Sequence, residues 1–170
     1  MAVAAPADDR PWQPHGGTST ARTTTGRPGI PMQDPFNLQR FVTAQQGVYQ
    51  AVRAELQEGL KRSHWMWFIF PQIKGLGHSE ISRRYAIASA EEAAAYLRHA
   101  ILGQRLRECT KLVLATQGRS IHGILGSPDD LKFHSCMTLF SRADPNEPLF
   151  RDALDRFFGG TPDHNTLERL

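Results

Sequence analysis

Apolar residues recur at steps of three and four along most of this chain, in segments that begin with capping residues and stop at glycine. The clearest segment carries Tyr49, Val52, Leu56 and Leu60, with polar residues between them, and ends near Gly59. This spacing puts the apolar side chains on one face of an α-helix. Because similar segments fill most of the 170 residues, the pattern predicts an all-α, mainly helical fold with a single compact domain.

Further helices are predicted from start signals, in which a side chain able to cap a helix precedes a proline or first-turn acids. The signals lie at Asp34-Pro35, Ser89-Ala-Glu-Glu92, Ser127-Pro128-Asp129-Asp130 and Asp144-Pro145-Asn146-Glu147. They precede apolar stripes within Leu38–Val42, Ala93–Leu97, Leu131–Phe140 and Leu149–Phe158, and another stripe from Leu102 to Val113 stops at Gly118. Gly159-Gly160 ends the last long helix, and Thr161-Pro162-Asp163 predicts one short terminal turn.

One segment, His64-Trp-Met-Trp-Phe-Ile-Phe-Pro-Gln-Ile73, departs from this pattern because aromatic and β-branched residues crowd it. Such residues favour a strand. A single strand does not make a sheet, so the segment is expected to be either a buried short helix or an extended thread through the core.

Residues 1–33 contain five prolines, four glycines and a Thr/Ser-rich run, but almost no large apolar residues. A segment of this composition cannot bury enough apolar surface to offset the entropy lost on ordering. We therefore expect a disordered N-terminal tail over 1–33 and one helical domain over 34–170.

Composition narrows the class of protein further. No apolar run approaches the roughly 18 residues that a membrane helix needs, and no signal-peptide pattern opens the chain, so no membrane partner is expected. Cys109 and Cys136 lack the spacing of a metal or redox site and are expected to be free thiols of a cytoplasmic protein. The net charge of +3 is spread along the chain, so a nucleic-acid partner is unsupported and a protein partner is not identified.

The aromatic segment is the first candidate for a binding site. Trp65, Trp67 and Phe70 supply more ring surface than one buried face requires. They form either core or a stacking wall for a planar ring such as adenine, nicotinamide or a nucleobase. His64 and Gln72 bracket these rings with polar groups that could orient a ligand through hydrogen bonds.

A glycine loop, Lys74-Gly-Leu-Gly-His-Ser79, follows the aromatic segment and precedes Arg83 and Arg84. The backbone amides of a glycine turn beside two cations can cradle a phosphate. The loop lacks the spacing of a P-loop or a dinucleotide fingerprint, so the alternative is an ordinary loop that caps a helix with solvated arginines.

Titratable residues concentrate at the helix start after Pro128. The helix dipole favours Asp129 and Asp130 there whether or not they react, and either could contact a ribose or act as acid or base. Lys132 is harder to explain, because a cation is disfavoured in a first helical turn. It is therefore the leading catalytic candidate, either as an anchor for a phosphate or carboxylate or as an amine nucleophile that forms an imine with an opened sugar.

The sequence contains no motif for a helical metal site, a serine nucleophile or a Cys–His pair. No two histidines share the i, i+4 spacing of a helical metal site, so no metal is predicted, and no cofactor is implied. No G-x-S-x-G nucleophile elbow occurs. Cys136 lies two residues after His134, which puts the two side chains on different helix faces and argues against a thiolate pair.

Several dense stretches resemble the bacterial domain-of-unknown-function family 1810, whose members are sometimes mislabelled calpastatin. The resemblance covers about residues 34–170 and implies a compact, mainly helical fold without bringing an activity. The stretches are Asp34-Pro-Phe-Asn-Leu-Gln-Arg-Phe41, Ser63–Ile73 with Gly75-Leu-Gly77, Arg84-Tyr-Ala-Ile87, Pro128-Asp-Asp-Leu-Lys-Phe133, Met137-Thr-Leu-Phe140 and Asp155-Arg-Phe-Phe-Gly-Gly160.

A second resemblance involves Leu97–Leu106 and Ala115-Thr-Gln-Gly118, which are similar to a conserved-pattern region of the NADAR superfamily. Ala100 stands where that pattern has proline, and Gln117 interrupts its Thr-Gly pair. The likeness implies action on NAD-derived ADP-ribose compounds and N-glycosidic bonds. Two hypotheses follow: a pocket that binds or hydrolyses a nucleotide-like ligand, and a non-catalytic interaction or structural domain.

Overall fold

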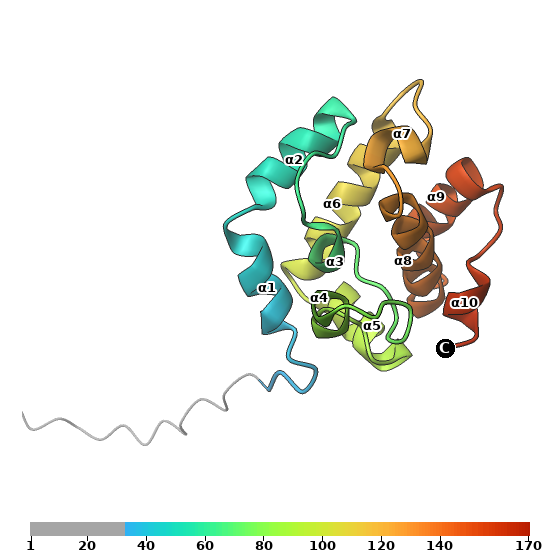
Figure 1. Cartoon of the computed structure of the whole chain (residues 1–170). Helices are drawn as coiled ribbons and strands as arrows, with labels where there is room; N and C mark the ends of the chain where they lie inside the picture. Colours follow the sequence, from blue (N-terminus) through green and yellow to red (C-terminus); the bar gives the residue numbers. More distant parts are fainter. Residues whose placement is uncertain (1–32) are drawn as a thin grey trace, which may run out of the picture. The chain divides into compact units, whose positions relative to one another are not determined.

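The structure is a computed structural model that describes residues 33–170, and these residues form ten α-helices and no strand (Figure 1). The helices are α1 (Gln39–Gln46), α2 (Tyr49–Glu58), α3 (Met66–Ile69), α4 (Glu80–Arg84), α5 (Ala90–Arg98), α6 (Leu102–Ala115), α7 (Ile121–Leu125), α8 (Asp129–Ala143), α9 (Pro148–Phe158) and α10 (His164–Leu167). The all-α prediction is therefore confirmed for this part of the chain. The tail expected over residues 1–33 lies, apart from Gln33, outside the described residues.

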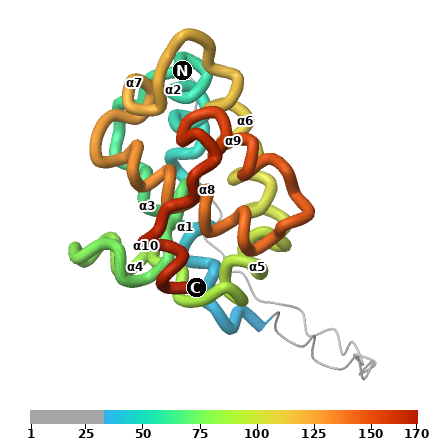
Figure 2. Tube along the Cα trace, turned by 90° about the vertical axis from the view of Figure 1, so that its right-hand side faces the viewer, coloured from blue at the N-terminus to red at the C-terminus, as the bar shows by residue number. Residues whose placement is uncertain are grey.

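The two longest helices, α6 and α8, organise the packing of residues 33–170. Helix α8 contacts α5, α7, α9 and α10, while α6 contacts α2, α3, α5 and α9. Figure 2 shows α8 with α9 and α10 beside it. The inward side chains of α8 are fully buried, among them Phe133, Cys136, Met137 and Phe140. Burial of each such side chain contributes about 1.5–3 kcal/mol, so α8 is the main apolar element of the core.

The expected helix boundaries hold where capping groups and glycines mark them. The Ser89 hydroxyl accepts a hydrogen bond from the Glu92 amide at the start of α5. Helices α2 and α9 end at Gly59 and Gly159, with φ angles of 71° and 61°. Glycine adopts this left-handed conformation without a Cβ clash, which explains why these helices stop there. The short terminal turn is α10, whose first amides are capped by Asp163.

The proline start signals need correction. Pro35 lies in a turn, and α1 begins only at Gln39, although Asp34 still accepts hydrogen bonds from the amides of Leu38 and Gln39. Pro128 occupies the N-cap of α8 and not its first helical position. At the start of α9, that first position belongs to Pro148.

The aromatic segment combines the two expected conformations. Residues 66–69 form the short buried helix α3, and the chain then runs extended to a single parallel bridge between Ile73 and Ile87. Two hydrogen bonds of 2.8 Å form the bridge. The Ile87 amide donates to the Gln72 carbonyl, and the Lys74 amide donates to the Ile87 carbonyl. Helix α4 is the helix that the loop of residues 74–79 was expected to cap in the alternative interpretation, whereas α7 was not expected, because five residues are too few to show an apolar period.

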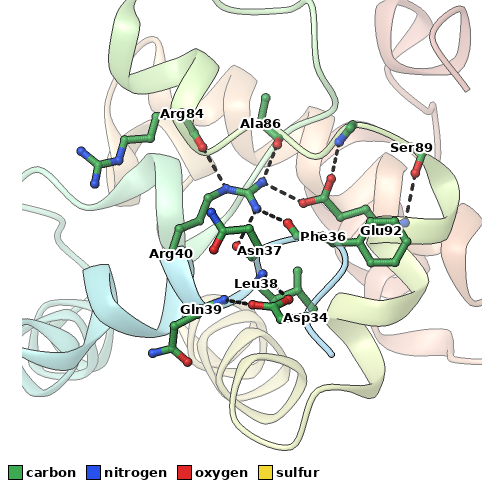
Figure 3. Close-up of polar contacts among 11 residues, drawn as sticks. Asp34, Phe36, Asn37, Leu38, Gln39, Arg40, Arg84, Ala86, Ser89 and Glu92 are labelled. Carbon is green, nitrogen blue, oxygen red and sulfur yellow. Dashed lines mark hydrogen bonds and ion pairs between the residues drawn. The ribbon is translucent and has the colours of Figure 1, made fainter. Parts of the chain in front are cut away.

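Arg40 of α1 binds the segments that precede α1 and α5 through its side chain (Figure 3). A guanidinium has five N–H donors, and all five are matched here. Nε donates to the Arg84 carbonyl at 2.9 Å, Nη1 to the carbonyls of Phe36 and Asn37 at 2.6 and 2.8 Å, and Nη2 to the Ala86 carbonyl at 2.9 Å and Glu92 Oε1 at 2.7 Å. Arg40 therefore joins the start of α1 to the end of α4 and the first turn of α5.

Glu92 is the buried partner in this network. Its side chain is 3% exposed, and its second oxygen accepts the Ala88 amide at 2.7 Å. The same carboxylate thus caps α5 and neutralises Arg40. This pair therefore joins α1 to α5 near the start of the described residues.

Candidate functional site

Two adjoining hollows lie where the segment between α3 and α4 meets the start of α8 and the C-terminal turn. The larger has a volume of about 610 Å³ and the smaller about 290 Å³. Four residues line both hollows, namely Trp67, Gln72, Gly77 and Ser82, so the two form one groove. Figures 1 and 2 show the segment between α3 and α4 passing beside α10. The larger hollow is within the usual range of ligand pockets, about 300–1,000 Å³.

Trp67 and Lys132 face each other in the groove. The Nζ of Lys132 lies 4.6 Å from the centre of the Trp67 ring, within cation–π distance. It also lies 3.3 Å from Asp129 Oδ1, one turn earlier on α8. Both contacts favour the ammonium, which accounts for a cation in the first turn of a helix.

Asp129 is shared between two lysines. Its Oδ2 lies 2.9 Å from the Nζ of Lys61, a side chain that is only 8% exposed, while Lys132 contacts the other oxygen. The Lys61 ammonium in turn lies 5.0 Å from the centre of the Trp65 ring. The aspartate therefore connects the buried side of α8 with the groove.

Trp65 and Phe70 belong to the core and do not line the groove. The Phe70 ring meets the Phe133 ring edge to face at 5.1 Å, and the indole nitrogen of Trp65 donates to Glu55 at 2.8 Å. Burial alone would raise the pKa of Glu55, but hydrogen bonds from Trp65, Ser63 and the backbone outweigh it and lower that pKa to about 2. Of the predicted aromatic wall, the structure leaves Trp67 at the groove.

Three other predicted residues lie elsewhere. His64 is exposed and lines neither hollow. The Arg84 guanidinium lies 5.6 Å from the centre of the Tyr85 ring, outside the lining of both hollows. The Asp130 carboxylate lies 3.3 Å from His122 Nδ1 and accepts the Leu131 amide, and it also lines neither hollow.

Gln72 and Arg83 do reach the groove. The bridge between residues 73 and 87 fixes the backbone of Gln72, whose half-buried side chain lines both hollows. Arg83 lines the smaller hollow, and its Nε donates to the Ser79 carbonyl at 3.4 Å. The structure thus brings together Trp67, Gln72, Arg83 and Lys132, from three segments separated along the chain.

The C-terminal turn supplies groove residues that the sequence analysis did not single out. Asp163 lines the larger hollow, and its Oδ2 accepts hydrogen bonds from Ser135 Oγ, the Thr166 hydroxyl and the Thr166 amide at 3.2, 2.6 and 3.0 Å. Asn165 and His134 line the same hollow. A cap at the start of a short helix was the only local signal for Asp163, and nothing nearby in the sequence indicates its distant neighbour Ser135.

Nucleophilic cysteine chemistry does not fit this protein. Cys109 and Cys136 are buried, and burial raises the pKa of the Cys109 thiol to about 12 and that of Cys136 well above its usual value. Within residues 33–170, no three His, Cys, Asp or Glu side chains gather as a metal site would require. In the same part of the chain, none of the helices combines the length and apolar character needed to cross a bilayer. The groove instead offers cations, the carboxylate of Asp163 and one indole.

Comparisons with known proteins give a family and a fold. Residues 35–170 match the family model described as "Protein of unknown function (DUF1810)". The crystal structure of the conserved hypothetical protein Rv1873 from Mycobacterium tuberculosis is 55% identical, with a TM-score of 0.80, over 81% of this chain and 98% of that one. No curated protein matches significantly. The NADAR likeness is not found, and the residues that suggested it, within 97–118, line neither hollow.

Proposed function

This chain belongs to the DUF1810 family of proteins of unknown function, and we propose that its groove binds a nucleotide-like ligand of the NAD or ADP-ribose type. The observation that carries the proposal is the convergence of Trp67, Arg83 and Lys132 on two adjoining hollows. These residues supply one planar ring and two cations. A nucleotide presents the complementary groups, which are a flat base and phosphates.

The ring of the ligand is proposed to contact Trp67. This indole is the one large aromatic side chain of residues 64–73 that lines the groove, and it lines both hollows. Lys132 already lies over the ring, so an incoming anionic group can draw on that ammonium while the base packs against the remaining indole surface. The Gln72 amide, which makes no side-chain hydrogen bond to another described residue, can recognise a base edge.

Hydrolysis of an N-glycosidic bond is the reaction proposed for this ligand. Water would attack the anomeric carbon, the C–N bond would break, and the base would leave with a proton. Asp163 is the carboxylate that lines the larger hollow, whereas Asp129 and Asp130 line neither hollow and reach this site only through the contact of Asp129 with Lys132. Lys132 serves better as an anion anchor than as a nucleophile, because an amine must lose its proton before it attacks carbon.

A protein-interaction role is the second candidate, and one observation favours it. Leu131, on the rim of the larger hollow, is 61% exposed, the most exposed large apolar side chain of the described residues. A partner protein that covered Leu131 would remove its apolar surface from water, which would favour docking at this rim. In that case the groove would accept a side chain of the partner, and small nucleotides would not bind.

Isothermal titration calorimetry of the full chain with ADP-ribose, NAD and adenosine tests the two candidates. We expect ADP-ribose to bind, and Trp67→Ala and Lys132→Ala each to weaken it about tenfold or more. Lys111→Ala, which removes a lysine from the exposed face of α6, is the matched control and should leave affinity unchanged. No heat with any of the three compounds at millimolar concentration would refute nucleotide binding and favour the interaction domain.

A further inference from the structure

We infer that the smaller hollow is an anion subsite for a phosphate or pyrophosphate group, built by the glycine loop of residues 74–79 together with Lys74, Arg83 and the C-terminal Arg169. The inference deepens the proposed function, on which it rests for the remainder of the ligand. It assigns the charged end of that ligand to one side of Trp67.

The charge of the hollow is the first support. Lys74 and Arg83 are among its lining residues, and no acidic residue is. The Lys74 ammonium and the terminal nitrogens of Arg83 donate no hydrogen bond to another described residue. The one side-chain hydrogen bond of Arg83 runs from Nε to the Ser79 carbonyl. Arg107, which lines a different hollow, is by contrast paired with Glu147 at 2.7 Å. Two unneutralised cations in one concavity attract an anion.

The backbone of the loop is the second support. Gly75 and Gly77 line the hollow, and within residues 33–170 the amides of Gly75, Leu76 and Gly77 donate to no protein acceptor. Gly75 has a φ of +99°, a conformation that L side chains rarely adopt. Consecutive free amides in such a turn are the groups that form anion-binding nests.

Arg169 adds a cation from the other end of the chain. A Cβ placed on Gly75 would lie 2.9 Å from Arg169 Nε, so the arginine side chain packs directly on the loop where glycine leaves room. Its Nη1 donates to the Asn165 carbonyl at 2.8 Å, and Asp163 anchors the same turn to α8 through Ser135. Arg169 therefore lies against the glycine loop of the smaller hollow, while Asp163 and Asn165 of the same turn line the larger one.

Gly77 explains how the loop reaches α4. A Cβ on this residue would lie 2.5 Å from both Cβ and Oγ of Ser82, a distance that real side chains do not tolerate. Glycine thus lets the loop amides approach the helix that carries Arg83. An alanine at this position must push the loop away from α4 without removing any charge, which makes it a geometric probe of the subsite.

The arrangement defines the ligand class. The phosphates occupy the smaller hollow, and the base lies against Trp67 on the side of the larger hollow, toward Lys132 and Asp163. A phosphorylated nucleoside matches this order of groups, whereas adenosine alone leaves the cations of the smaller hollow without a partner.

The test uses inorganic pyrophosphate, which carries no ring, titrated into the full chain by calorimetry at low and moderate salt. We expect binding that weakens with salt and becomes about tenfold or more weaker in Arg83→Ala, Arg169→Ala and Gly77→Ala. The matched controls are Arg98→Ala, on the exposed face of α5, and Gly47→Ala, where a Cβ would meet nothing within 4 Å. Circular dichroism should show that all five variants keep the helical fold.

The pyrophosphate titration tests the anion subsite independently of nucleotide binding. No pyrophosphate binding, or binding that Arg83→Ala and Gly77→Ala leave unchanged, would overturn the subsite even if ADP-ribose binds through Trp67. Pyrophosphate binding lost in these variants would support the subsite even if ADP-ribose, NAD and adenosine all fail to bind.

Discussion

Replacing Arg40 should destabilise the protein more than replacing any surface cation, because this guanidinium donates to four backbone carbonyls and to the buried carboxylate of Glu92. Breaking a buried ion pair by removing one partner costs about 3–5 kcal/mol. Arg40 is 15% exposed and Glu92 keeps the Ala88 amide, so water and that amide offset part of the loss. For Arg40→Ala we therefore expect the lower end of the range, about 3 kcal/mol, which is about 12 °C in Tm for a domain of this size.

Two further variants separate the charge from the hydrogen bonds. Arg40→Lys keeps a cation opposite Glu92 but has three donors where arginine has five, so it should cost about 1.5 kcal/mol. Adding Glu92→Gln to Arg40→Ala removes the orphaned charge, and the double variant should be less destabilised than the sum of the single variants by about 1–2 kcal/mol.

Urea unfolding followed by circular dichroism measures these free energies. Lys111→Ala, an exposed lysine in the middle of α6, is the control and should lie within about 0.5 kcal/mol of wild type. If Arg40→Ala costs less than about 1 kcal/mol, or if its effect simply adds to that of Glu92→Gln, the network does not hold the start of the domain as argued.

Three other predictions concern separate features. The pKa of Glu55 is about 2 in the folded protein, against an ordinary value of 4.5, so its stabilising contribution is full above about pH 5 and is lost as pH falls toward 2. In Glu55→Gln, the free energy of unfolding should therefore depend less on pH between 5 and 2 than in the wild type. Gly59→Ala should lower the unfolding free energy by about 1 kcal/mol or more, since its φ is +71° and a Cβ would lie 2.8 Å from Thr116 Cγ2, whereas Gly47→Ala should not. We propose that residues 1–33 are a dispensable tail, so deleting them should move the Tm by less than about 5 °C, as scanning calorimetry will show.

The long helices were predictable from the sequence because each carries its own signal. The stripe of α2 and its stop at Gly59 can be read locally, as can the capping box of α5. The short helices α4 and α7 are harder to predict, because five residues show no apolar period and the local signal of each is a single capping serine, Ser79 or Ser120. The proline signals failed by a few residues because a capping side chain such as Asp34 can reach amides four and five positions ahead.

The groove could be predicted only in part, because its residues come from distant segments. The sequence pattern identified the rings and cations near it. It could not distinguish Trp65 from Trp67, two residues along the chain, although Trp65 is buried in the core and Trp67 lines the groove. The same holds for Arg83 and Arg84, neighbours that face different surfaces. The contribution of the C-terminal turn depends on how α10 packs on α8, which no local pattern encodes.

Lys132 shows how an anomaly in the sequence becomes a usable test in the structure. Its position in a first helical turn was unexpected, and Asp129 and the Trp67 ring now account for its charge. Removing the lysine would usually leave its carboxylate partner unpaired and cost stability. Here Lys61 stays 2.9 Å from the other oxygen of Asp129, so Lys132→Ala leaves that carboxylate paired. The variant should therefore fold within a few degrees of wild type, and any large loss of ligand affinity in Lys132→Ala reports on the groove itself and not on the fold.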